Sequence, residues 1–146
     1  MDIAPLAKSA GMKLDEVRAL LNCDVICGSN RLDSDITECF AADMMSDVLA
    51  FCKPRAMLIT GLTGVQSIHT ADVAELTAIL FVLNKKPVQQ VLDILQAKQI
   101  PVLSTPYTMF EACGLLYGKG LKGGYHERDK VAEESRKETM ELPGSK

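Results

Sequence analysis

Residues 56–105 decide the fold, and they read AMLITGLTGVQSIHTADVAELTAILFVLNKKPVQQVLDILQAKQIPVLST. This stretch holds three short apolar runs, AMLIT, TAILFVL and IPVLST, which are typical of buried strands. Two segments with helical spacing separate them. In KPVQQVLDILQAKQ the apolar residues recur at i, i+3, i+4 and i+7 from Val88, and Pro87 suits the first helical position. Single helices between continuously apolar strands predict parallel strands joined by right-handed crossovers.

The segments on either side extend the same pattern. On the N-terminal side, KLDEVRALLN predicts a helix, CDVICG and ITECFA predict strands, and Ser46 is placed to cap a short helix in SDVLAFC. On the C-terminal side, TMFEACGLLYGKG predicts a last helix, with Thr108 and Glu111 at capping-box spacing and Gly118 or Gly120 at its end. We therefore predict a three-layer α/β/α fold with a mostly parallel sheet.

Length and composition indicate one domain followed by a tail. The chain has 146 residues and is 47% hydrophobic, which suits a single core. From Tyr125 onward the composition becomes charged, in HERDKVAEESRKETMELPGSK, with too few apolar residues to offset the entropy of ordering. We predict an α/β domain over residues 1–124, which includes a short helical piece around residues 3–9, and a charged tail over residues 125–146.

Charge and hydropathy exclude several classes of partner. The net charge is −3 and the pI is about 5.4, which argues against binding nucleic acid through its phosphates. No apolar stretch approaches the roughly 20 residues that cross a bilayer, and the N-terminus MDIAPLAKSAG does not resemble a signal peptide. We expect no membrane association and a cytoplasmic location.

The cysteines do not predict a disulfide framework or a metal site. Their number is odd and most lie in apolar runs, so we expect reduced, buried thiols at Cys23, Cys27, Cys39, Cys52 and Cys113. The spacing of Cys23 and Cys27 is not that of a CxxC motif, and the two histidines, His69 and His126, are distant in sequence. We predict no metal and no cofactor.

No catalytic signature is complete. The stretch GKGLKGG at 118–124 lacks the Ser or Thr of a phosphate-binding P-loop, and GLTG at 61–64 is too short for a GxGxxG motif. An enzyme built on carboxylates would need Asp43, Asp72 or Glu111 to converge on one pocket. We predict a non-enzymatic protein without catalytic residues, and a small transferase or hydrolase remains the alternative from the enzyme class.

Two loops are candidate ligand sites, because ligands of parallel sheets collect beyond the carboxyl ends of the strands. The loops at 60–64 and 104–108 each leave a predicted strand and lead to a helix N-terminus that can bind an anion. We predict that they face each other and bind an anionic or nucleotide-like ligand through backbone donors and hydroxyls, since neither holds a basic residue. The candidate residues are Thr60, Gly61, Leu62, Thr63, Gly64, Gln66, Ser104, Thr105, Tyr107 and Thr108. In the alternative, the glycines only form turns and the threonines only cap helices.

The order of short patterns resembles the DRTGG domain family. The resemblance covers about residues 12–123 and rests on MSDVL, on LIT followed by a glycine, on KKP before the central helix and on IPVLST before the last. It implies a fold similar to the DRTGG domains of phosphotransacetylases and CBS-domain pyrophosphatases, and to the N-terminal domain of the HPr kinase/phosphorylase. The chain looks most like the stand-alone form, which occurs in some anaerobes near iron hydrogenase genes.

The resemblance implies an accessory module that forms homodimers. The residues behind the family name are absent, since Leu62 and Thr63 stand in place of Asp-Arg, and residues 82–84 (Val-Leu-Asn) stand in place of Thr-Gly-Gly. No role of those five residues carries over. We expect a homodimeric regulatory or ligand-sensing module, with a ligand-free protein that docks on an unknown partner enzyme, in hydrogenase metabolism for example, as the alternative.

Overall fold

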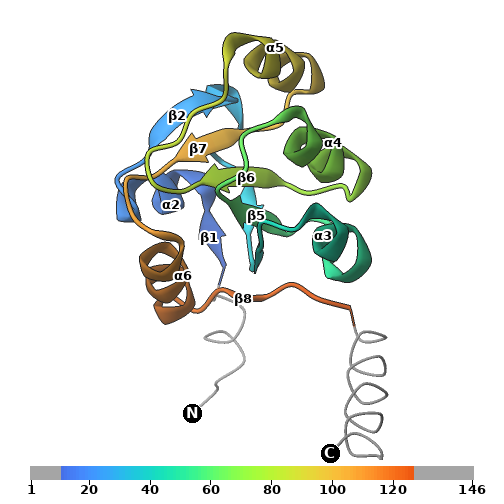
Figure 1. Cartoon of the computed structure of the whole chain (residues 1–146). Helices are drawn as coiled ribbons and strands as arrows, with labels where there is room; N and C mark the ends of the chain where they lie inside the picture. The colour runs from blue at the N-terminus through green and yellow to red at the C-terminus, as the bar shows by residue number, and fades with distance from the viewer. Residues whose placement is uncertain (1–10, 127–146) are drawn as a thin grey trace, which may run out of the picture.

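The computed structural model describes residues 11–126, and within them a six-stranded sheet lies between two layers of helices (Figure 1). The strands of this sheet are β2 (Asp24–Cys27), β4 (Glu38–Ala41), β5 (Met57–Thr60), β6 (Ala78–Phe81), β7 (Val102–Ser104) and β8 (Lys122–Gly123). The helices are α2 (Leu14–Leu20), α3 (Met45–Phe51), α4 (Val65–Val73), α5 (Gln89–Lys98) and α6 (Met109–Gly118). The predicted α/β fold with a mostly parallel sheet is confirmed.

A second, smaller sheet was not predicted. It pairs β1 (Met12–Lys13) with β3 (Asp35–Ile36) in antiparallel fashion. The polar stretch SNRLDSD, which predicts only a turn, contains a 3-10 helix, η1 (Ser29–Arg31), and leads into β3. Ile36 is fully buried, so this short pair closes the core beside α2.

The main sheet has the strand order β2-β7-β6-β5-β4-β8. Neighbouring strands are parallel except for β2, which runs antiparallel to β7. Strands β4 to β7 follow one another in chain order, and each is joined to the next by one helix. Every residue of β5 and β6 is buried, as their continuous apolar sequences predict for strands covered on both faces.

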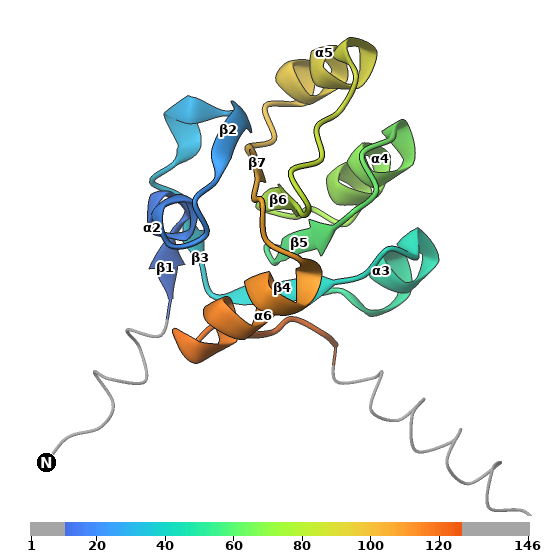
Figure 2. The same cartoon turned by 60° about the vertical axis from the view of Figure 1, so that its left-hand side comes forward.

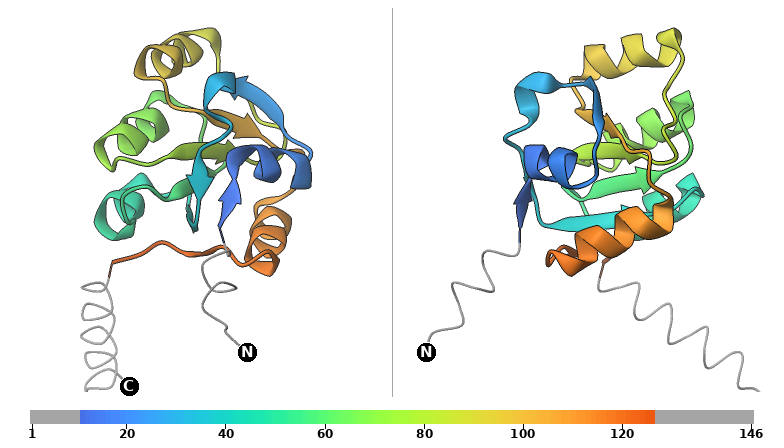
Figure 3. Two further views of the ribbon diagram at one scale, coloured as in Figure 1. Left: turned by 180° about the vertical axis from the view of Figure 1, so that it is seen from behind. Right: turned by 90° about the vertical axis from the view of Figure 1, so that its left-hand side faces the viewer.

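Alternate side chains of each strand enter two separate cores, because successive residues of a strand point to opposite faces. On one face Leu58, Ile79 and Phe81 pack against α3, α4 and α5. On the other face Met57, Ile59 and Leu80 pack against α2 and α6. Figures 2 and 3 show these two groups of helices on opposite sides of the sheet.

Helix α6 reverses the direction in which the chain winds. After β7 the chain returns across the sheet to β8, beside β4, whereas β4 to β7 progressed the other way. A right-handed crossover in the opposite direction requires the helix to lie on the opposite face. This requirement explains why α6 lies apart from α3, α4 and α5 (Figure 2).

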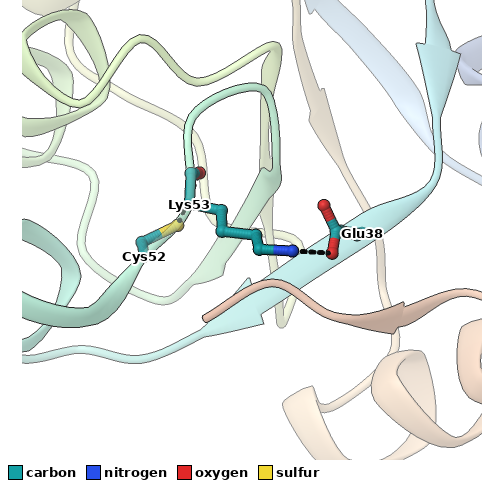
Figure 4. A network of polar contacts seen from close by, with 3 residues as sticks. All are labelled: Glu38, Cys52 and Lys53. Atoms are coloured by element: carbon teal, nitrogen blue, oxygen red, sulfur yellow. Dashed lines mark hydrogen bonds and ion pairs between the residues drawn. The ribbon is translucent and has the colours of Figure 1, made fainter. Parts of the chain in front are cut away.

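Strand β8 is held at the edge of the sheet by backbone pairing rather than by its side chains. Lys122 and Gly123 pair with Glu38 and Cys39 of β4, and the carbonyl of Gly124 accepts a 2.8 Å hydrogen bond from Lys53 N. Figure 4 shows the Lys53 side chain reaching Glu38, where Nζ and Oε2 lie 3.1 Å apart. The stretch 118–124, which predicts only a helix end, therefore also supplies a strand.

Two predicted helix starts were wrong. Ser46 lies inside α3, whose N-cap is Met44, because the helix begins early enough for Met45 to reach the core. Pro87 lies before the N-cap of α5, because Val88 is extended at ψ 162° and the first helical residue is Gln89. Val88 is consequently 67% exposed and does not contribute to the core face.

The start and end of α6 were predicted correctly. The Thr108 hydroxyl accepts a hydrogen bond from Glu111 N (3.1 Å), and Thr108 N donates to Glu111 Oε1 (3.2 Å), which completes the capping box. Gly120, with φ 99°, follows the C-cap Lys119 and provides the left-handed residue that commonly ends a helix.

Gly28 allows the chain to leave β2 directly against the loop before β7. Its φ of 80° is left-handed, and a Cβ atom at this position would lie 2.5 Å from Pro101 Cα. A side chain here would therefore collide with backbone rather than with a flexible neighbour. Glycine is required for both conformation and space.

The five cysteines are free thiols. Cys52 is buried, whereas the other four are only partly buried, so the prediction of buried thiols was correct for one of them. Burial raises the pKa of Cys23, Cys39 and Cys52 to about 12. These three thiols stay protonated at neutral pH, which disfavours a role as nucleophiles.

Within residues 11–126 no helix is both long and apolar enough to cross a bilayer. The predicted helical piece around residues 3–9 and residues 127–146 of the predicted tail lie outside the described residues. At the start of that tail, Tyr125 pairs with Cys52 and His126 N donates to Phe51 O. The domain boundary at residue 124 stays a prediction.

Ser67 on α4 carries a fully buried hydroxyl without a hydrogen-bond partner in the described structure. A buried polar group that lacks a partner costs about 1–3 kcal/mol. We therefore expect Ser67→Ala to raise the free energy of unfolding by about 1 kcal/mol, as measured by urea denaturation. Ser46→Ala, at an exposed position of α3, is the control and should change it by less than about 0.5 kcal/mol. A loss of stability in Ser67→Ala would show that the hydroxyl has a partner.

Candidate functional site

The carboxyl ends of four parallel strands, β4, β5, β6 and β7, lie at one edge of the sheet. The predicted loops at 60–64 and 104–108 follow β5 and β7 at this edge, as expected. They do not face each other directly, because β6 and its loop at 82–88 lie between them. Three neighbouring loops, rather than two, make up the candidate site.

The middle loop is bonded to both of its neighbours. Toward the first loop, Val82 N donates to Thr60 O (3.2 Å). Toward the second, Leu83 N donates to Tyr107 O (2.9 Å) and Asn84 N donates to Thr105 O (2.7 Å). The three loops therefore form one connected surface with little freedom to separate.

The middle loop turns through two consecutive left-handed residues. Leu83 and Asn84 have φ values of 58° and 56°, and Lys85 N donates to Val82 O (3.2 Å), which defines a type I′ turn. Glycine suits such positions best, yet this chain forms the turn with a leucine and an asparagine. The Leu83 side chain is 53% exposed.

The first loop is organised by Asp43, a residue that the sequence analysis did not place here. Its Oδ1 accepts hydrogen bonds from Thr60 Oγ1 (3.0 Å) and from Gly61 N (2.8 Å). Thr60 Oγ1 in turn accepts from Leu62 N (3.2 Å). The hydrogen bonds of the fully buried Thr60 hydroxyl therefore hold the loop in its conformation. The exposed Asp43 carboxylate links the loop to the end of β4.

Lys85 brings a positive charge to the first loop, where the sequence analysis expected none. The lysine follows β6, and its Nζ donates to Gly61 O at 3.3 Å. A Cβ atom on Gly61 would lie 3.3 Å from the same Nζ and 3.6 Å from Asp43 Oδ1. Gly61 thus allows the ammonium and the carboxylate to approach the loop backbone. The adjacent Lys86 instead pairs with Asp24 at 2.9 Å.

The second loop uses its hydroxyls within the fold. Ser104 Oγ donates to Lys85 O (2.7 Å), and Thr105 Oγ1 donates to Leu21 O (2.6 Å) while it accepts from Tyr107 N (3.2 Å). Both Ser104 and Thr105 are fully buried. Thr108 caps α6. For these three residues the geometry supports the alternative in which the polar groups serve turns and caps.

The start of α4 is the part of the predicted site that remains open. Gly64 is its N-cap and makes no side-chain capping bond, and a Cβ atom at Gly64 would meet nothing within 4 Å. Gly64 and Gln66 are exposed, and Thr63 is partly exposed. The first N–H groups of this nine-residue helix are therefore accessible to an anion, at the end of the loop whose Gly61 carbonyl accepts from Lys85.

Exposed aliphatic side chains surround these polar groups. They come from the N-cap of α3, from the first loop and α4, and from the middle loop, and they are Met44, Leu62, Val65, Leu83 and Val88, each between 39% and 67% exposed. A surface that combines an accessible helix N-terminus, one lysine and an apolar surround can accommodate a ligand with an anionic and an apolar part.

The carboxylates that an enzyme would need do not converge. Asp43 contacts the first loop, Asp72 pairs with Lys98 at 2.7 Å, and Glu111 takes part in the capping box of α6. Within residues 11–126, no group of three or more His, Cys, Asp and Glu side chains is arranged to hold a metal ion. The geometry gives the transferase or hydrolase alternative no support.

Comparison with solved structures gives the same fold at low sequence identity. The chain is similar to the crystal structure of the CBS and DRTGG domains of the regulatory region of Clostridium perfringens pyrophosphatase, in complex with the activator diadenosine tetraphosphate. The TM-score is 0.61 and the identity 19%, over 82% of this chain and 51% of that one. The chain thus spans about half the length of that regulatory region. A comparison with curated proteins finds no match.

A match to a family model assigns the chain to a family, which the low sequence identity to solved structures does not do. The model of the DRTGG domain matches residues 16–117, which run from α2 to the end of α6 and include all three loops of the candidate site. The match covers well over half of the chain, and it agrees with the fold and with the order of short patterns in the sequence. The chain belongs to the DRTGG domain family.

Proposed function

We propose that this protein is a non-enzymatic, homodimeric regulatory module that senses an anionic or nucleotide-like small molecule at the carboxyl edge of its sheet. The observation that carries the proposal is that Lys85 Nζ contacts Gly61 O, in the loop that leads into the N-terminus of α4, and that this N-terminus has no side-chain cap. The lysine supplies a full positive charge and the helix supplies unpaired N–H donors, which together favour a phosphate or carboxylate.

The surroundings of Lys85 support a ligand with an apolar part. Leu62, Val65 and Leu83 are exposed next to the charged groups, and a base or another flat apolar group could rest against them. The solved regulatory region that shares this fold was crystallised with a dinucleotide activator, which supports the choice of nucleotides as the first ligands to test.

The test is calorimetric titration of the wild-type protein with ATP, ADP, diadenosine tetraphosphate and a panel of phosphorylated metabolites. We expect a dissociation constant in the micromolar range for at least one nucleotide. Lys85→Met should weaken it at least about tenfold, because a charge-assisted hydrogen bond contributes roughly 1.5–3 kcal/mol and each 1.4 kcal/mol corresponds to a factor of ten.

Lys86→Met provides the matched control. It removes the same charge from the next residue, but Lys86 is directed to Asp24, so the affinity should change by less than about twofold. Equal loss in both variants would indicate a non-specific charge effect and contradict the proposed site. If no member of the panel binds the wild-type protein, the proposal of nucleotide sensing fails.

A second function, docking on a partner protein without a small ligand, is favoured by the exposed aliphatic side chains at the same edge. An apolar surround with few charges is typical of the centre of a protein interface. In that case nucleotides would not bind, while Leu62→Asp and Leu83→Asp would abolish capture of the partner without lowering the stability of the domain. The titration therefore separates the two functions.

A further inference from the structure

The outer side of α6 is apolar and largely exposed in the described structure. Phe110 is 87% exposed and Tyr117 is 77% exposed, the largest exposed fractions among the big hydrophobic residues of residues 11–126. They lie on either side of Gly114, whose Cβ position has nothing within 4 Å. Figures 2 and 3 show α6 at the outside of the molecule, on the face opposite to α3, α4 and α5.

The spacing places these residues on one stripe of the helix. Ala112 and Leu116 are buried and face the sheet. With about 100° per residue, Gly114 lies opposite to them, with Phe110 one turn before it and Tyr117 almost one turn after it. The stripe therefore presents an aromatic ring at each end and a glycine in the middle.

We propose that this stripe is the surface through which two copies of the chain pair, with their α6 helices antiparallel and crossing at Gly114. The inference rests on the homodimer of the proposed function and names its interface. A two-fold axis requires that residue i contacts j and that j contacts i. An antiparallel pair centred on Gly114 meets this condition, because Phe110 then lies next to the partner's Tyr117 at both ends of the contact.

The apolar surface extends from the stripe toward β4. A groove of about 120 Å³ beside Tyr117 is lined by side chains that include Cys39, Ile59 and Cys113. Each aromatic side chain can bury roughly 150–250 Å², so the four rings of two copies would bury on the order of 600–1,000 Å². The groove and the flanking residues raise this area toward the roughly 1,200 Å² of a stable interface. A second copy of this chain therefore accounts for the exposed stripe.

Crosslinking tests the position of the two-fold axis on the full-length protein. Gly114→Cys places two thiols opposite each other at the crossing point, within the range of a disulfide, and should give a covalent dimer on mild oxidation. Gln96→Cys, at an exposed position of α5 on the other face of the sheet, should remain monomeric in a denaturing gel, as should the wild type with its five cysteines. Equal crosslinking of the two variants would overturn the interface.

Light scattering over a dilution series tests the contact itself. The wild type should have twice the 15.9 kDa mass of the chain, whereas Phe110→Glu should have the monomer mass while its circular-dichroism spectrum remains that of the folded wild type. Val73→Glu is the control, at a residue of α4 that is 57% exposed, and it should stay dimeric. A dimeric Phe110→Glu would overturn the interface but leave the homodimer intact, whereas a monomeric wild type would overturn both. Nucleotide titration of Phe110→Glu reports separately on the ligand site.

Discussion

Gly28→Ala is expected to destabilise the domain by about 3 kcal/mol. The residue has φ 80°, where a side chain costs roughly 1 kcal/mol, and the new Cβ atom would lie 2.5 Å from Pro101 Cα and 2.8 Å from Pro101 Cβ. Neither Pro101 atom can rotate away, because both belong to a fixed ring and backbone that lead into β7. Relief of the overlap requires β2 to move from β7, at a further cost of about 1–3 kcal/mol.

The measurement is thermal and urea unfolding followed by circular dichroism. A loss of 3 kcal/mol corresponds to a fall of the melting temperature of roughly 10 °C for a domain of this size. Gly123→Ala is the matched control, since its Cβ position has nothing within 4 Å and its φ is not left-handed. It should melt within about 2 °C of the wild type. A Gly28→Ala protein as stable as the control would show that β2 can leave β7 at little cost.

Thr105→Val is expected to cost about 2–3 kcal/mol although it preserves the shape of the side chain. The fully buried hydroxyl donates to Leu21 O at 2.6 Å and accepts from Tyr107 N at 3.2 Å. Valine leaves the carbonyl and the N–H group without this partner, and a buried group without a partner costs about 1–3 kcal/mol. The bond to Leu21 joins the end of α2 to the loop after β7, so its loss loosens both.

Thr77→Val is the matched control for this prediction. The Thr77 hydroxyl also donates to a carbonyl, Arg55 O, at 2.7 Å, but in a solvent-exposed position where water can replace it. Its loss should cost less than about 1 kcal/mol in the same denaturation experiment. The two variants also separate structural from ligand roles, because Thr105→Val should leave nucleotide affinity unchanged in the folded protein. If Thr105→Val kept the stability of the wild type but lost affinity for nucleotide, Thr105 would be a ligand-binding residue.

The central part of the fold could be predicted because each element carries its own local signal. Strands β5, β6 and β7 are formed by apolar runs, and α6 begins with a capping box. These elements can therefore be predicted without knowledge of residues distant in the sequence. Strand β8 has no such signal. Its two residues are Lys122 and Gly123, both exposed, and they form a strand only because α6 brings them beside Glu38 and Cys39.

The candidate site could be predicted in its location but not in its composition. Parallel strands place their following loops at one edge, which the alternation of elements reveals. The order of strands in the sheet cannot be predicted from short segments of sequence. This order places β6 between the two predicted loops and brings Asp43 close to Gly61. Lys85 was the one omission that could have been avoided, because NKKP directly follows an apolar strand and so lies at the same edge.

The position of β2 has a consequence for how the chain folds during synthesis. Among residues 11–126, its one neighbour in the sheet is β7, which leaves the ribosome after more than half of the described residues have followed β2. At about 5–20 residues per second, β2 and the apolar side of α2 wait on the order of 10 seconds for their partner. Strands β4, β5 and β6 need no such wait, since each pairs with the strand that follows it in the chain. The nascent chain thus exposes Leu14, Val17 and Leu21 for longest, and these residues are where a chaperone would bind first.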